Sequence, residues 1–70
     1  MKRFGEKLHT LRQQRGLTLR QLADLVGVHN THLSKIELGK KRPSSDLILQ
    51  IASVFNVTAD QLMRDDLEVD

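Results

Sequence analysis

The chain has 70 residues, a formal net charge of +2 and no cysteine, so no disulfide staples its core. A chain of this size is expected to form one small domain that buries only about 60% of the surface of its unfolded form. The sequence contains no apolar signal segment and no span of about 20 apolar residues, and a cytoplasmic protein is the default expectation.

The charges are unevenly distributed along the chain. Residues 1–42 hold ten Lys and Arg against three acidic residues, a balance of +7, whereas residues 43–70 hold one Arg against six acidic residues, a balance of −5. This asymmetry indicates a polyanionic partner for the basic end, although charges that only solvate a surface give the same pattern. Aromatic residues make up 3% of the chain, with no Trp or Tyr, which argues against stacking on the bases of single strands.

Two helices are expected in the first part of the chain. Residues 3–14 are predicted to form the first helix, which Gly16 stops. Its buried stripe at helical spacing consists of Phe4, Leu8 and Leu11. Thr18 and Gln21 have the spacing of a capping box that opens the second helix, and Gly27 ends it. The buried side of the second helix is predicted to consist of Leu22, Ala23 and Val26.

The third helix is predicted to begin at His29 or Asn30, of which Asn30 is the better cap, and to end at Leu38 before Gly39. Its inward positions are expected to be Val28, Leu33 and Ile36. Ala23 is small where the second and third helices must approach closely, and Gly27 permits the sharp turn between them. This pair of helices predicts a helix-turn-helix.

The basic loop GKKRPSS follows and contains the only proline, which the helical pattern cannot cross. Ser44 or Ser45 caps a fourth helix. Its broad apolar face is made by Leu47, Ile48, Ile51, Ala52 and Phe55. Thr58 and Gln61 repeat the capping box and open a short fifth helix, which carries Leu62 and Met63 toward the core.

The expected fold class is therefore all-α, a compact bundle of five helices in which the second and third form the helix-turn-helix. Residues 1–66 are predicted to be the domain. Residues 67–70 are predicted to be an acidic tail, either frayed or leading into a longer parent chain.

Three segments occur in a characteristic order, namely LRQQRGLTLRQLADLVGV, HLSKIELGKKRPS and LILQIASVFNVTADQL. Together they resemble the DNA-binding domain of the phage-repressor and Cro family, also called the xenobiotic-response-element family, over about residues 4–63. The resemblance implies a lambda-repressor-like bundle that binds double-stranded DNA as a homodimer on an inverted-repeat operator. It also implies regulation of transcription at the nucleoid, with repression as the expected outcome.

The resemblance places the third helix, about residues 29–38, in the major groove. By position, the residues that match the family's base-reading sites are Asn30, Thr31 and Lys35, with His29 and Ser34 next in line. The chemistry agrees, because Asn can pair with adenine N6 and N7, Lys can donate to guanine, and Thr offers a hydroxyl and a methyl group. A merely solvated polar face is the alternative.

Phosphate contacts are expected from both edges of this surface, at the start of the second helix and in the basic loop. The predicted residues are Thr18, Arg20, Gln21, Lys40, Lys41 and Arg42. Many relatives carry a glutamine that bridges a phosphate and a base-reading side chain where this chain has Leu19, so Arg20 or Gln21 is expected to take over. The resemblance also implies an ion pair of Arg12 with Glu37 beneath the DNA surface; the alternative is an exposed pair that contributes about 0–1 kcal/mol.

The sequence gives less support for a metal site, an enzyme or a protein-interaction module than for DNA binding. His29 and His32 lie three residues apart on the third helix, but two histidines without cysteine do not close a zinc site, and neither a metal nor another cofactor is expected. An enzyme is not expected either, because a small bundle offers little room for a pocket and the sequence contains no glycine-rich phosphate loop. The main alternative function is a protein-interaction module or an antitoxin-like partner. Leu67 and Val69 suit a dimer surface or a continuation of the chain.

Overall fold

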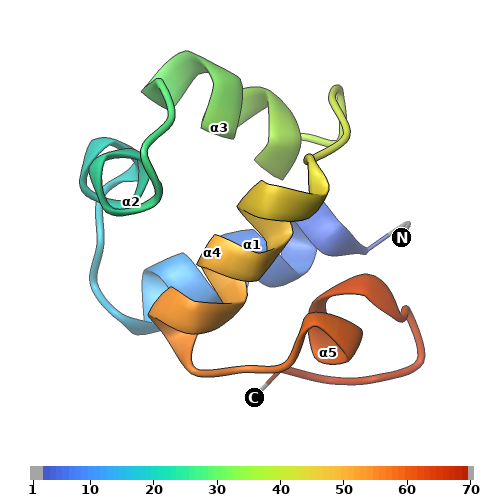
Figure 1. Cartoon of the computed structure of the whole chain (residues 1–70). Helices are drawn as coiled ribbons and strands as arrows, with labels where there is room; N and C mark the ends of the chain where they lie inside the picture. The colour runs from blue at the N-terminus through green and yellow to red at the C-terminus, as the bar shows by residue number, and fades with distance from the viewer. Residues whose placement is uncertain (1–2, 70) are drawn as a thin grey trace.

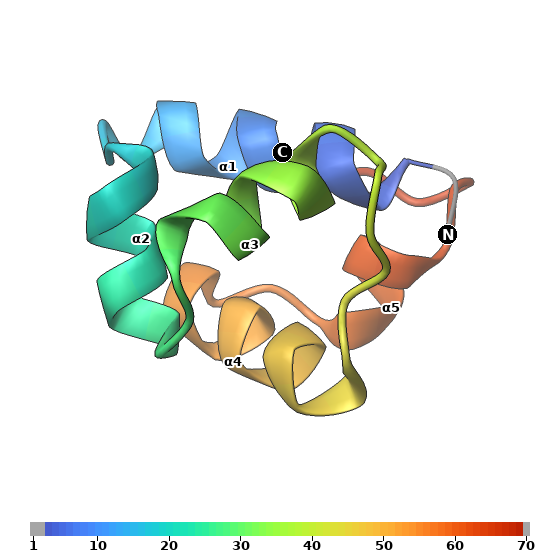
Figure 2. The same cartoon turned by 90° about the horizontal axis from the view of Figure 1, so that it is seen from above.

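The computed structural model describes residues 3–69. Its helices are α1 (Phe4–Gln14), α2 (Leu19–Val26), α3 (Asn30–Glu37), α4 (Ser45–Phe55) and α5 (Ala59–Met63). The contacts between them join α3 to α1 and α2, α4 to α2 and α5, and α5 to α1 (Figure 1). Seen from above, α3 has α1 on one side and α4 on the other, while α2 and α5 lie at opposite ends (Figure 2). The predicted all-α bundle is confirmed for the described residues, outside which residues 1, 2 and 70 lie.

Apolar side chains from all five helices form one core. Its buried members are Phe4, Leu8, Leu11, Leu22, Ala23, Val26, Leu33, Ile36, Leu47, Ile48, Ile51, Ala52, Phe55 and Leu62. Val28, expected inside, packs partly buried against this core. Met63 is 39% exposed, so the expectation that it helps to complete the core is wrong. The reason is that α5 turns one side to the core, and Leu62 occupies that side.

The two predicted capping boxes are confirmed. At the start of α2, the Gln21 amide donates to Thr18 Oγ1 at 3.1 Å, and the Thr18 amide donates to Gln21 Oε1 at 2.8 Å. At the start of α5, Thr58 and Gln61 form the same reciprocal pair of bonds at 2.9 and 3.0 Å. Each box satisfies amide groups that the helix itself leaves without acceptors.

The first helix carries a buried lysine that its apolar stripe alone does not predict. Lys7 lies among the core residues, and its Nζ donates to the carbonyl oxygen of Gln61 at 2.5 Å and to that of Arg64. These carbonyls belong to the last turn of α5 and the residue that follows it, where no further helical amide is available. The ammonium of Lys7 therefore ties the end of α5 to α1.

The described part of the acidic tail packs back onto α1 and α5. The Arg3 amide donates to Asp65 Oδ1 at 2.9 Å, and the Arg3 guanidinium contacts both Glu68 carboxylate oxygens at 3.1 and 3.2 Å. Hydrogen bonding from Arg3 lowers the pKa of Glu68. Val69 lies partly buried against the core. A frayed tail does not match these contacts, while the predicted domain boundary after residue 66 stays a prediction. None of the helices within residues 3–69 has the length and hydropathy needed to cross a bilayer.

Candidate nucleic-acid interface

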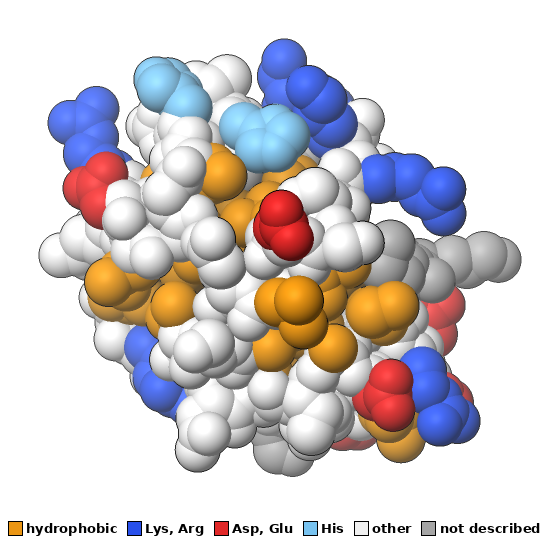
Figure 3. All heavy atoms as spheres, viewed as in Figure 1, with side chains coloured by type: hydrophobic (Ala, Val, Ile, Leu, Met, Phe, Trp, Pro, Cys, Tyr) orange, Lys and Arg blue, Asp and Glu red, His pale blue; other side chains and the backbone are white. Residues whose placement is uncertain are grey.

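The outer face of α3 carries the predicted base-reading residues. Thr31 and Lys35 lie one turn apart and are exposed, as is His29 just before the helix. Asn30 and Ser34, also one turn apart, are half-buried. Histidine side chains and a group of Lys and Arg side chains lie along the edge of the molecule formed by α3 and the loop after it (Figure 3). Four of these residues lie on α3 and His29 caps it, and the contact of all five with bases stays a prediction.

His29 caps α3, so the preference for Asn30 as the cap is wrong. His29 has extended backbone angles, and its Nδ1 accepts from the Thr31 amide at 3.1 Å. The turn after Gly27, which has a φ of 72°, brings the His29 ring over the first amide groups of α3. The imidazole of His29 takes the capping role. The side-chain amide of Asn30 therefore makes no hydrogen bond to any residue from 3 to 69, and its NH₂ donor and its oxygen acceptor stay available.

One edge of this face is the start of α2. Thr18 and Gln21 are exposed there, but both side chains already serve the capping box. Arg20 is exposed and forms no hydrogen bond or ion pair within the described part of the chain. Of the two residues considered to take over at this edge, the geometry favours Arg20. Leu19 packs partly buried against the core.

A hollow separates Arg20 from the start of α3. It lies between α2 and α3 and is lined by Arg20, Ala23, Asp24, Val28, His29 and Asn30. Ala23, expected to be small where the two helices approach, is buried and is one of the residues that line this hollow. Asp24 is the one acidic residue in this lining and repels phosphate. Arg20 is the one Lys or Arg in the lining, so it must supply the attraction for any phosphate that approaches this edge.

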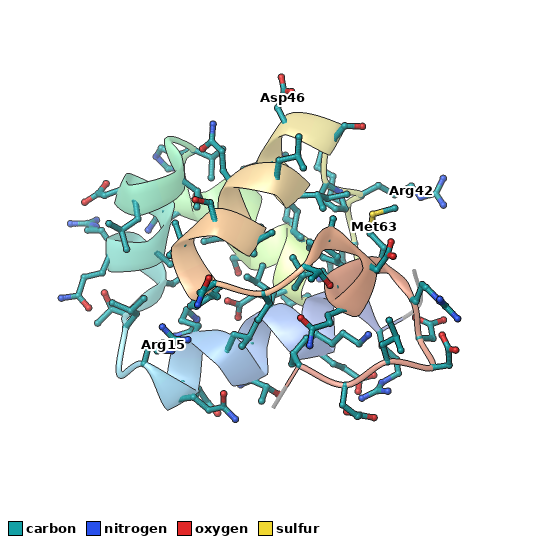
Figure 4. The ribbon with its side chains drawn as sticks, turned by 60° about the horizontal axis from the view of Figure 1, so that its bottom comes forward. Arg15, Arg42, Asp46 and Met63 are labelled. Atoms are coloured by element: carbon teal, nitrogen blue, oxygen red, sulfur yellow. The ribbon has the colours of Figure 1, made fainter. Side chains whose placement is uncertain are left out.

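The opposite edge is the loop after α3. Gly39, with a φ of 77°, ends the helix in the left-handed conformation that favours glycine, and Lys40, Lys41 and Arg42 follow with exposed side chains. The Arg42 side chain extends outward from the body of the protein (Figure 4). Positive charge therefore flanks α3 on both edges, as a groove between two phosphate backbones requires.

Arg12 and Glu37, expected to pair, form a two-pronged ion pair between α1 and the end of α3. Arg12 Nε donates to Glu37 Oε2 at 2.7 Å, and Nη2 donates to Oε1 at 3.2 Å. The side chains are only 16% and 8% exposed, so the alternative of an exposed surface pair does not apply. Arg12 Nη1 also donates to the carbonyl oxygen of Leu17, which joins the connection between α1 and α2 to the same network.

Gly5 and His9, for which the sequence motifs predict no role, also shape this site. A Cβ at Gly5 would lie 2.4 Å from the Glu37 carbonyl oxygen and 2.7 Å from that of Ile36, so the missing side chain lets α1 touch the end of α3. His9 Nδ1 lies 3.0 Å from Glu37 Oε1. The position of His9, three residues before Arg12 on one helical face, is the signal that could have indicated it.

Residues 3–69 contain no group of three His, Cys, Asp or Glu side chains arranged to hold a metal ion. The surface offers cationic side chains, the side-chain amides of Asn30 and Gln21, and several hydroxyl groups. Groups of these kinds are able to donate hydrogen bonds to phosphates and to the edges of bases.

Known proteins are similar to this chain in sequence and in fold. BcrR, an HTH-type transcriptional activator of Enterococcus faecalis, is 42% identical over 60 residues, which are 86% of this chain and 29% of BcrR. RghR, an HTH-type transcriptional repressor of Bacillus subtilis, is 39% identical over 64 residues, which are 90% of this chain and 47% of RghR. The chain thus spans less than half the length of either relative.

The N-terminal DNA binding domain of SinR from Bacillus subtilis superimposes with a TM-score of 0.87 at 26% identity, covering 97% of this chain and 100% of that domain. A helix-turn-helix family model matches residues 8–62. The chain accordingly belongs to the helix-turn-helix family, in agreement with the resemblance to phage repressors and Cro found in its sequence.

Proposed function

We propose that this chain binds double-stranded DNA sequence-specifically as the DNA-binding part of a transcriptional regulator. The observation that carries the proposal is the polar outer face of α3, flanked by Arg20 on one edge and by Lys40, Lys41 and Arg42 on the other. The names of BcrR and RghR as transcriptional regulators support it. Repression remains the expected outcome, and its place of action is then the nucleoid in the cytoplasm.

Within this proposal, α3 enters the major groove. Asn30 reads an adenine, Lys35 a guanine, and Thr31 a thymine methyl group or a hydrogen-bonding base edge, with His29 and Ser34 beside them. A well-placed pair of hydrogen bonds of this kind discriminates against a wrong base by about 1–3 kcal/mol. Arg20 and the cations after α3, together with the exposed Thr18 and Gln21, contact phosphates and hold α3 in register.

We infer that two chains bind together on an inverted repeat, because one small domain makes few phosphate contacts. A two-fold dimer would place its α3 helices about 34 Å apart, one turn of B-DNA. Leu67 is half-buried and Val69 packs on the core of its own chain, whereas Met63 is exposed on α5 (Figure 4). Among the apolar residues of α5 and the described tail, Met63 is therefore the one we expect at the dimer surface. Sedimentation with and without a palindromic duplex tests the dimer.

Selection of bound duplexes from a random pool tests the proposal. We expect an enriched inverted repeat, against which two variants are compared. Asn30→Ala should cost about 1–3 kcal/mol at one base position, while Lys41→Ala should weaken all duplexes alike and lower the salt slope by about 1. Ser53→Ala, exposed on α4 and outside the proposed interface, is the control. Equal losses on all sequences for Asn30→Ala would contradict its role, and no enrichment at all would favour a protein-interaction module.

A further inference from the structure

His9 lies between two groups that compete for the same ring nitrogen. Its Nδ1 is 3.0 Å from Glu37 Oε1 and 3.2 Å from Arg12 Nη2. A hydrogen on Nδ1 permits a bond to the carboxylate, whereas a lone pair permits only the bond from Arg12. The doubly protonated ring alone can donate to Glu37 from Nδ1 and to an outside acceptor from Nε2 at the same time. Nε2 has no partner among residues 3–69, and the side chain is 46% exposed.

His9 opens onto a hollow that borders the proposed DNA surface. The hollow lies between α1, α2 and the end of α3, and its lining includes His9, Leu19, Ser34 and Glu37 together with Glu6, Arg12 and Leu38. Ser34 belongs to the predicted reading face. Leu19 stands where the resemblance leads one to expect a phosphate-bridging glutamine, so this part of the surface lacks that donor.

The charges around the hollow leave His9 as the group able to meet an anion. Glu6 and Glu37 are acidic and Arg12 is basic, so the lining carries one net negative charge with a neutral imidazole and none with a protonated one. The hydrogen bonds of Arg12 are directed to Glu37, His9 and the Leu17 carbonyl oxygen. Leu19 is the only α2 side chain in the lining, and it is uncharged.

We propose that His9 binds a DNA backbone phosphate through Nε2 in its protonated form, so that DNA binding takes up a proton. The inference rests on the proposed function, because it needs a duplex held against α3. The phosphate is a backbone phosphate and not a free ion, since a free anion in this hollow would face Glu6 and Glu37 without the other contacts of the interface. By linkage, lower pH then favours the complex.

The test compares wild type with His9→Gln and His9→Lys, using the selected duplex at pH 6 and pH 8 and constant ionic strength. His29 and His32 also lie near the interface, but they are common to all three proteins. From pH 8 to pH 6, wild-type affinity should rise by up to about tenfold more than that of His9→Gln. His9→Lys should bind tightly at both pH values. At pH 6, His9→Gln should have a salt slope lower by about one phosphate contact.

Two controls separate the possible failures. Melting curves confirm that each variant is folded, and NMR of the wild-type His9 ring gives a second measurement in the intact protein. The ring signals should shift with duplex and stay unchanged with inorganic phosphate. An unaltered pH profile and salt slope for His9→Gln, an equal loss at every pH and salt concentration, or a matching shift with inorganic phosphate would each overturn the inference. Failure of wild type to bind any duplex would instead overturn the proposed function, and this inference with it.

Discussion

Arg12→Ala tests how α3 is held in place. The substitution removes both hydrogen bonds to Glu37 and the bond to the Leu17 carbonyl oxygen, while the Glu37 side chain stays only 8% exposed. Leaving one partner of a buried ion pair alone costs about 3–5 kcal/mol. Arg12 is 16% exposed and His9 still faces Glu37, so we expect a smaller loss of about 2–3 kcal/mol in the free energy of unfolding.

Thermal unfolding followed by circular dichroism measures this loss. For a domain of this size, 1 kcal/mol lowers Tm by about 4–8 °C, so we expect a drop of about 8–24 °C. DNA affinity should fall as well, because an unneutralised Glu37 at the end of α3 repels phosphate.

Adding Glu37→Gln to Arg12→Ala should recover part of the stability, since no buried charge is then left alone. Arg20→Ala, which removes an exposed cation, is the matched control and should weaken DNA binding with Tm nearly unchanged. An unchanged Tm for Arg12→Ala would refute the reasoning.

Two further predictions concern the packing of α1 and the tail. Gly5→Ala places a Cβ against backbone oxygens of α3 and should destabilise the domain by about 1–3 kcal/mol in urea denaturation, with Thr10→Ala, exposed on the same helix, as the control. Acid should release the tail, because Arg3 lowers the pKa of Glu68 in the folded chain. This contribution to stability is present above the ordinary glutamate pKa of about 4.3 and is lost as the pH falls through the lowered value. NMR signals of Val69 should report that loss in wild type and should show no such acid transition in Glu68→Gln.

The helices and the core follow from local information in the sequence. Leu22 and Val26 repeat at helical spacing, and Thr18 with Gln21 supplies a cap whose two partners lie three residues apart. Such patterns need no knowledge of the rest of the chain. The cap of α3 is a partial exception, because Asn is the better capping residue in general, but the turn after Gly27 brings the His29 ring to the amide of Thr31.

The contacts that the sequence did not predict join residues far apart in the chain. Lys7 donates to carbonyl oxygens 54 and 57 residues away, and Arg3 contacts Glu68 across 65 residues. Neither partner can be identified without the fold. Lys7 does fall between Phe4 and Leu11 at helical spacing, so its place on the buried stripe could be predicted from the sequence. The carbonyl groups that accept its hydrogen bonds could not.

The residues proposed to read bases and the residues that hold α3 in place lie on different helices, which has a consequence for mutagenesis. The side chains assigned to the bases project from α3, whereas Gly5, His9 and Arg12, which set or neutralise the end of α3, all belong to α1. A change on the face of α3 removes one hydrogen-bonding partner and should alter preference at one base position. A change in α1 displaces the whole reading helix or alters the charge beneath it. Substitutions that remove the contacts of Gly5, His9 or Arg12 should therefore weaken binding to all duplexes in parallel, although none of these residues is expected to touch a base.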